Sequence, residues 1–189
     1  MRKKLTEFIV TIIFLYKIKT KNLFIFLYLY FKFKRFIPDR LNQKYLEIAI
    51  FEGSSLVYFS RILKNSSFTC VDIWKGQEEL NECDFEIIEK NFHYNSSDIS
   101  KDKIIINKNS SRNFFIEKNN KFSIIYIDGN HSYKEVLNDL NESFRILLNG
   151  GILSLDDYTW SWYSDPKNNP GYAINVFLNE NYNKLKFYV

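Results

Sequence analysis

The chain has 189 residues, enough for one domain with a sizeable core, and its 46% hydrophobic and 18% aromatic content excludes general disorder. Residues 1–35 hold nine Lys or Arg and one acid, a net charge of +8. Because the whole chain has a net charge of +4, residues 36–189 carry −4. A net acidic domain argues against a nucleic-acid partner. The two cysteines, Cys70 and Cys83, show neither disulfide nor metal-ligand spacing, which favours a reducing, cytoplasmic setting.

A basic, aromatic arm over residues 1–40 precedes a domain that we place at residues 41–189. Two apolar runs in the arm, Phe8–Tyr16 and Leu23–Phe31, are too short for the ~20 residues that a membrane-spanning helix needs. Three interpretations remain open. The arm forms lid helices that cover the sheet or its site, residues 1–35 lie on an anionic membrane surface and make the protein peripheral to a membrane, or the true start lies downstream and part of the arm is not expressed.

Within the domain, apolar strand patterns alternate with amphipathic helix patterns. Strands are expected at 45–50, 68–72, 103–106, 124–127, 152–155 and 185–189, and helices at 54–63, 77–92, 133–147 and 172–178, with a short helix after Ser111. This alternation predicts an α/β fold with a doubly wound, mostly parallel sheet. Ser132 and Glu135 form an expected capping box for the helix that starts at Tyr133, and Asn149-Gly150 are expected to close it.

Carboxylates follow two of the expected strands directly. The strand at 124–127 ends at Asp128, with His131 three residues later, and the strand at 152–155 ends at Asp156-Asp157. In a parallel sheet, ligands bind beyond the carboxyl ends of the strands. Three carboxylates and an imidazole in one crevice suit Mg²⁺ binding and deprotonation of a hydroxyl. Any single Asp could instead cap a helix or turn.

The turn after the first domain strand is a second candidate region. Residues 47–55 place backbone N–H groups and a helix start at the same crevice, although a G-x-G-x-x-G fingerprint is absent and Gly53 is the glycine that remains. Asp72 follows the next strand, where an acid can bind ribose hydroxyls. A helix cap is the alternative for Asp72.

Together these segments resemble the class I S-adenosylmethionine-dependent methyltransferases, specifically the branch of Mg²⁺-dependent sugar and macrolide O-methyltransferases and catechol-type enzymes. The resemblance covers about residues 43–180 and rests on four motifs in order: 46–55, 71–76, 127–133 and 150–158. It implies a Rossmann-like methyltransferase sheet that binds S-adenosylmethionine.

The resemblance also implies roles for particular residues. The cofactor-binding set is Glu47, Gly53 and Ser55 around the methionine part, Ala49 and Phe51 of the same turn, Asp72 for the ribose, Ser110 or Ser111 for the adenine, and Asp128. The implied metal ligands are Asp128, Asp156 and Asp157, and His131 matches a general base. The implied reaction is methyl transfer to a hydroxyl of a small molecule or sugar, and a homo-oligomer is an open expectation.

Two departures from the family pattern give weight to an alternative function. Ala49 replaces the usual glycine of the first turn, and the chain ends at Val189, where the family usually has a further antiparallel strand pair, so a missing last strand or a shortened edge is expected. The alternative is a degenerate, non-catalytic cofactor-binding protein on the same fold. A nicotinamide oxidoreductase is disfavoured by the missing glycines.

Overall fold

The computed structural model describes residues 8–12, 42–75, 84–117 and 120–188. Its elements in chain order are β1 (Phe8–Ile12), β2 (Lys44–Ile48), α2 (Ser54–Ile62), β3 (Ser67–Asp72), α3 (Phe85–Asn95), β4 (Ile104–Lys108), α4 (Ser111–Glu117), β5 (Phe122–Ile127), α5 (Tyr133–Ile146), β6 (Leu147–Leu155), η2 (Pro166–Asn168), α6 (Pro170–Asn181), η3 (Tyr182–Lys184) and β7 (Leu185–Tyr188). The described strands form one sheet in the order β4-β3-β2-β5-β6-β1-β7, and each neighbouring pair is parallel. The predicted doubly wound α/β sheet is confirmed.

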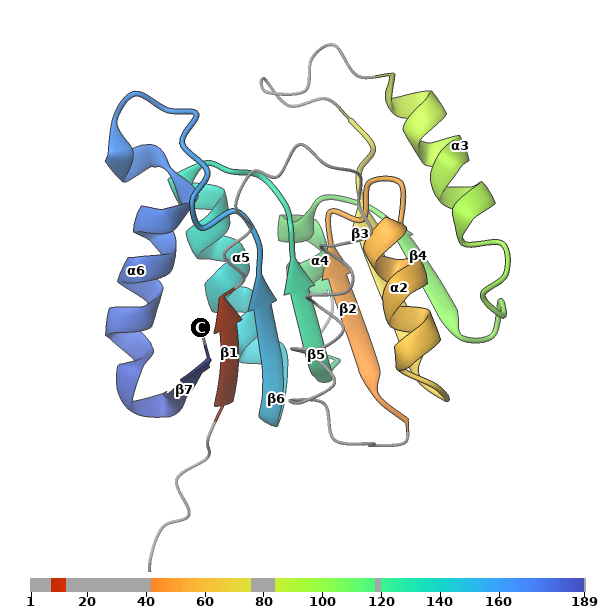
Figure 1. The fold of residues 1–189 in the computed structure, drawn as a ribbon, viewed down its shortest axis with the longest axis horizontal. Helices are drawn as coiled ribbons and strands as arrows, with labels where there is room; N and C mark the ends of the chain where they lie inside the picture. The colour runs from red at the N-terminus through yellow and green to blue at the C-terminus, as the bar shows by residue number, and fades with distance from the viewer. Residues whose placement is uncertain (1–7, 13–41, 76–83, 118–119, 189) are drawn as a thin grey trace, which may run out of the picture.

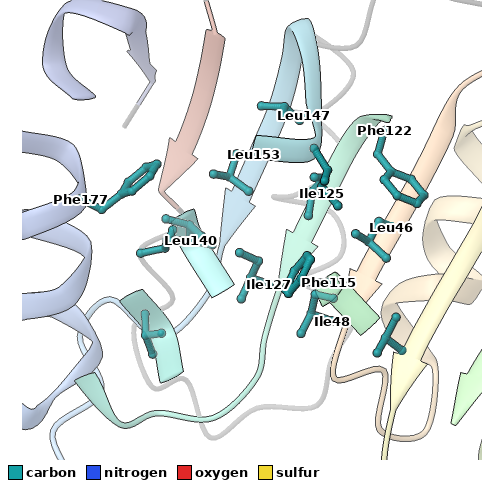
Figure 2. Close-up of a cluster of buried hydrophobic side chains, with 14 of the residues drawn as sticks. Leu46, Ile48, Phe115, Phe122, Ile125, Ile127, Leu140, Leu147, Leu153 and Phe177 are labelled. Atoms are coloured by element: carbon teal, nitrogen blue, oxygen red, sulfur yellow. The ribbon is translucent and has the colours of Figure 1, made fainter. Parts of the chain in front are cut away.

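Helices cover both faces of the sheet, with α2 in front of it and α4 and α5 behind it in Figure 1. The strands alternate their side chains between the two faces, since successive residues of a strand point in opposite directions. Leu46 and Ile48 of β2 pack with α4, α5 and α6, in the cluster that Figure 2 shows, whereas Tyr45 packs with α2 and α3. Both faces of the inner strands are therefore buried, which explains their continuous apolar sequence.

The N-terminal strand β1 corrects one expectation. Phe8–Ile12 lies inside the sheet, with Val10 opposite Leu153 of β6 and Phe187 of β7, where the sequence analysis expected a lid helix or a membrane-surface segment. The run is rich in β-branched residues, which suit a strand paired on both sides. The rest of the arm lies outside the described residues. Among those that are described, no helix has the length and apolar character needed to cross a membrane.

Three local expectations also need adjustment. The helix expected at 77–92 begins at Phe85 in the described part of the chain, and residues 76–83 lie outside it. The helix α5 ends at Ile146, so Leu147–Gly150 already belong to β6 and the expected closure at Asn149-Gly150 is wrong. Ser132 is the N-cap residue of α5, but its side chain makes no capping bond, so the capping box does not form.

Candidate active site

A cavity of about 450 Å³ lies across the carboxyl ends of β4, β3, β2 and β5, where the strand arrowheads of Figure 1 point. The chain runs from β2 to β3 on one side and the sheet continues with β5 on the other, so this edge is the topological switch point of the sheet. The volume is in the range of small-molecule sites. Its lining includes Ala49, Phe51, Asp72, Lys75, Ser110, Ser111, Asp128, His131, Glu135 and Asp139.

The turn after β2 is held in an unusual backbone conformation by the end of β3. Ala49 and Phe51 have φ values of 63° and 51°, in the left-handed region that non-glycine residues rarely adopt. The Phe51 N–H donates to Asp72 Oδ2 at 2.9 Å, and the Trp74 indole Nε1–H donates to the Phe51 carbonyl at 3.0 Å. These two bonds fix the turn against β3 and place its backbone along the cavity.

Asp72 lines the cavity and also organises it. Its Oδ1 accepts from the Trp74 N–H at 2.7 Å, so each oxygen of this half-buried carboxyl already holds a backbone group. Burial raises the pKa of Asp72, against the opposing effect of these backbone hydrogen bonds. Because each carboxylate oxygen has two lone pairs, the side chain retains acceptor capacity for ligand hydroxyls.

Glu47, Gly53 and Ser55 are not among the residues that line this cavity. Glu47 is 1% exposed; its carboxylate accepts from the Tyr45 hydroxyl at 2.7 Å and from the Ser55 hydroxyl. Burial raises the pKa of Glu47 to about 7, although both hydrogen bonds act in the opposite direction. At Gly53, φ is +77° and a Cβ atom would lie 2.8 Å from the Phe92 ring. The structure gives these residues a supporting place, and their predicted contact with a cofactor stays a prediction.

The residues after β4 and β5 form the opposite wall of the cavity. Ser110 Oγ accepts from the Asn113 N–H at 3.2 Å and so caps α4, whereas Ser111 lines the cavity together with Asp139 of α5. Asp139 is 2% exposed, and sequence reasoning missed it. The signal was its position on the buried face of α5, between Val136 and Leu140, where a charged residue needs a partner.

A compact acid cluster stands at the ends of β5 and β6. The Asp128 N–H donates to the Ile48 carbonyl at 3.2 Å and the Asp156 N–H donates to the Ile127 carbonyl at 3.1 Å, so the sheet ladder positions both residues. His131 Nε2 lies 2.9 Å from Asp157 Oδ2, and the ring stacks on Trp160 with centroids 4.5 Å apart. The ligand atoms of Asp128, His131 and Asp157 lie within 4.8 Å of one another.

The cluster differs from the expected metal set in one member. Asp156 Oδ2 accepts from the Tyr126 hydroxyl at 2.8 Å, and its Oδ1 accepts from the Asp157 N–H at 2.9 Å, so this carboxylate faces the sheet. His131, expected as a base, stands in the group instead. Both assignments stay predictions, but the structure places all four side chains together.

The charges of the cluster oppose one another. Burial, followed by the charges of Asp156 and Asp157, raises the pKa of Asp128 well above its ordinary value. Burial and the Asp157 charge raise the pKa of Asp156 to about 6. A divalent cation bound here would relieve this repulsion, because carboxylates that share a site favour protonation when nothing neutralises them. Two carboxylates and an imidazole fit a cation such as Mg²⁺ or Mn²⁺.

The order of the strands and a cavity across the switch point define a Rossmann-like methyltransferase fold, which solved structures of methyltransferases share. A family model described as "Methyltransferase domain" matches residues 46–158. Because the match covers more than half of the sequence, the chain belongs to the methyltransferase domain family. The resemblance predicted from the motifs is confirmed at this level, and the Mg²⁺-dependent O-methyltransferase branch stays a prediction.

Three solved structures illustrate the likeness. A proposed rRNA methylase from Clostridium thermocellum is 15% identical, with a TM-score of 0.57 over 86% of this chain and 84% of that one. A proposed sarcosine dimethylglycine methyltransferase from Galdieria sulphuraria is 19% identical, with a TM-score of 0.51 over 70% of this chain and 46% of that one. CalS11, a TDP-rhamnose 3′-O-methyltransferase of calicheamicin biosynthesis, is 11% identical, with a TM-score of 0.51 over 84% of this chain and 69% of that one.

At these identities the likeness establishes the fold alone. This chain spans about half the length of the Galdieria sulphuraria structure, at 46%. No protein with a curated function matches the sequence.

Proposed function

We propose that the chain transfers a methyl group from S-adenosylmethionine to a hydroxyl of a small molecule or sugar, with a divalent cation held by the acid cluster. One observation carries the proposal: Asp128 and His131 belong both to the acid cluster and to the cavity wall. A donor in the cavity and an acceptor on the cluster would therefore meet. The net acidic charge of residues 36–189 favours a small acceptor over a nucleic acid.

The charges of the cavity suit a cationic donor. Its lining holds the carboxyl groups of Asp72, Asp128, Asp139 and Glu135, and among the described residues Lys75 is the one lysine or arginine that lines it. Glu135 also pairs with Arg112 at 2.9 Å, outside the lining. A sulfonium ion is favoured where carboxylates outnumber cations, because low-dielectric walls strengthen that attraction. Asp72 would accept hydrogen bonds from the ribose hydroxyls of the donor.

The acid cluster would activate the acceptor. Asp128, Asp156 and Asp157 would hold the cation, which would supply a positive charge that lowers the pKa of a bound hydroxyl, and His131 would serve as the base. Asp157 orients His131 through the 2.9 Å contact with Nε2. If Nε2 carries the proton of neutral His131, Nδ1 is the basic nitrogen that takes the proton of the acceptor hydroxyl.

The reaction balances without a further reagent. The acceptor oxygen forms a bond to the methyl carbon, the carbon–sulfur bond breaks, and its electron pair remains on sulfur, which becomes a neutral thioether. The hydroxyl proton passes to His131. Since the displacement is direct, most of the acceleration comes from holding oxygen and methyl carbon in line.

Aromatic side chains beside the cluster favour an acceptor with a ring. Trp160 stacks on His131, and Trp162, which is 60% exposed, and Tyr163 follow in the same loop. Asn169 accepts from the Tyr163 N–H at 3.0 Å and donates to its carbonyl at 3.0 Å, which fixes this loop. A sugar or catechol with vicinal hydroxyls would place its ring against these faces and two oxygens on the cation.

A second candidate, a cofactor-binding protein without catalysis, is favoured by Ala49. Its methyl group lies in the cavity wall, on a backbone with φ of 63°. The two candidates differ in a single readout, because both bind the donor and only the enzyme passes its methyl group on.

Radiolabelled S-adenosylmethionine, offered with a panel of sugar nucleotides and catechols, tests the proposal. We expect label transfer that requires Mg²⁺ or Mn²⁺, disappears with chelator, and falls by at least 10²-fold in Asp128→Asn, because that change removes charge from cluster and cavity alike. Asp98→Asn, at an exposed acid away from the cavity, is the matched control and should retain full transfer. Full transfer in excess chelator would remove the metal from the mechanism, and donor binding without any transfer would favour the non-catalytic candidate.

A further inference from the structure

Tyr126 brings a buried hydroxyl group to the acid cluster from the core of the sheet. It lies on β5, opposite Ser154 of β6, and Asp156 follows Ser154 by two residues. Because residues two apart in a strand share a face, Tyr126 and Asp156 lie on the same side of the sheet. Tyr126 is 5% exposed, its ring lies 6.0 Å from that of Phe59 between centroids, and its hydroxyl donates to Asp156 Oδ2 at 2.8 Å.

The Asp156 carboxylate is held by one donor on each oxygen. Oδ1 accepts from the Asp157 N–H at 2.9 Å, and Oδ2 accepts from the Tyr126 hydroxyl. The backbone donor alone would allow the carboxylate to turn about its Cβ–Cγ bond. Among the described residues, the Tyr126 hydroxyl is therefore the side-chain donor that fixes its rotation. Each oxygen keeps a second lone pair for a further partner.

A small cavity of about 20 Å³ lies beside this carboxylate. All four residues of the acid cluster are part of its lining, namely Asp128, His131, Asp156 and Asp157. The volume admits one water molecule or one ion, since about 10–15 Å³ is enough for a water. Tyr126 is not among the described residues that line it. Asp156 therefore borders the space between the cluster side chains, and Tyr126 contacts Asp156 from outside that space.

We infer that Tyr126 is a positioning residue, which preorganises the cation site of the acid cluster by fixing the Asp156 carboxylate. The inference rests on the proposed function, in which Asp128, Asp156 and Asp157 hold a divalent cation. Carboxylates that bind a metal are commonly held by an outer hydrogen-bond donor, and loss of such a donor typically lowers metal affinity about 10–100-fold. Without the Tyr126 hydroxyl, the carboxylate would have to be ordered when the cation binds, and this ordering reduces affinity.

Titration of the metal-free protein with Mn²⁺, followed by electron paramagnetic resonance, tests the inference through binding alone. We expect one Mn²⁺ per native chain and an affinity about 10–100-fold lower in Tyr126→Phe, which keeps the ring and removes only the hydroxyl. Tyr45→Phe is the matched control. Its hydroxyl is equally buried and donates to Glu47 Oε2 at 2.7 Å, but Glu47 does not line the small cavity. Tyr45→Phe should bind Mn²⁺ as the native chain does, although it also loses a buried hydrogen bond.

A double-variant cycle shows whether Tyr126 acts through Asp156. Asp156→Asn should weaken Mn²⁺ binding by itself, and adding Tyr126→Phe should cause little further loss, because the carboxylate that the hydroxyl positions is already gone. Losses that add in full, an equal loss in Tyr45→Phe, or native or tighter Mn²⁺ affinity in Tyr126→Phe would overturn the inference and leave the proposed cation site standing. A native chain that binds no Mn²⁺ would instead overturn the proposed cation, and the inference with it.

Discussion

Ala49 adopts a left-handed backbone conformation at the wall of the cavity. Its φ of 63° costs an L-residue about 1–2 kcal/mol, whereas glycine adopts this conformation freely. We expect Ala49→Gly to raise the free energy of unfolding by up to about 1 kcal/mol, after the greater entropy of the unfolded glycine is subtracted. Removing the methyl group from the cavity wall should also tighten donor binding.

Urea unfolding and calorimetry check this pair of effects. Ala173→Gly, the same change at a buried helical position in α6, is the control and should lower stability by about 1 kcal/mol. If Ala49→Gly lowers the free energy of unfolding as much as Ala173→Gly does, the turn is not strained.

Asp157 is the residue on which the metal hypothesis depends most. It adopts a φ of 58° and meets His131 at 2.9 Å in a cluster of mutually repelling carboxylates. Asp157→Asn should weaken Mn²⁺ binding by tenfold or more, while the stability of the metal-free protein stays unchanged or rises, because one repelling charge is lost. Mn²⁺ binding followed by electron paramagnetic resonance measures the first effect, and thermal unfolding with chelator the second. Weaker metal-free stability together with native Mn²⁺ affinity would assign Asp157 a purely structural role.

At the scale of elements, β1 is the strand whose contribution is easiest to isolate. Val10 is paired on both sides, opposite Leu153 and Phe187. Val10→Pro removes a backbone N–H from the middle of the sheet, and leaving its partner unsatisfied should cost about 1–3 kcal/mol. Val10→Ile keeps the N–H and the β-branched side chain and should lie within about 1 kcal/mol of the native chain. Equal unfolding free energies for the two variants would place β1 outside the cooperative unit.

The contrast between β1 and the other strands shows what the sequence could predict. Strands β2, β5 and β6 were recognised because each is a short apolar run that ends in a polar turn and precedes a helix pattern. Phe8–Ile12 has the same strand-like composition, but basic residues flank it, and nothing local shows that its partners are β6 and β7. Pairing over such distances along the chain is a tertiary property.

The residues of the candidate site could also be predicted from the sequence only in part. Asp72, Asp128, Asp156 and Asp157 were identifiable because strand ends meet at one edge of a parallel sheet. The direction in which each side chain points could not be predicted: Asp156 binds the Tyr126 hydroxyl, Glu47 is buried against the Tyr45 hydroxyl, and Asp139 reaches the cavity from a helix. Those choices depend on neighbours that only the assembled sheet supplies.

For the whole molecule, buried acids predict an unusual dependence of stability on pH. Burial raises the pKa of Glu47 to about 7 and those of Asp139 and Asp156 to about 6, above the ordinary values near 4. Over this range the folded state binds more protons than the unfolded state, so stability falls as pH rises. The metal-free protein should therefore be more stable at pH 5.5 than at pH 8.

Unfolding free energies at both pH values, measured with chelator present, check the sign. Glu47→Gln, which is nearly isosteric, should remove a large part of the difference, because it cannot ionise. Exposed Asp98→Asn should leave the difference unchanged. Stability that rises steadily from pH 5.5 to pH 8 would mean that these acids are ionised and well paired in the folded protein.

Donor binding at the cavity is the central claim, and calorimetry with S-adenosylmethionine in the presence of Mg²⁺ measures it most directly. We expect one ligand per chain, with affinity lowered at least tenfold in Asp72→Ala, because hydrogen bonds to a charged group contribute about 1.5–3 kcal/mol each. Asp98→Asn should bind as the native chain does. Absence of binding by the native chain, or native affinity in Asp72→Ala, would contradict the assignment of this cavity as the methyl-donor site.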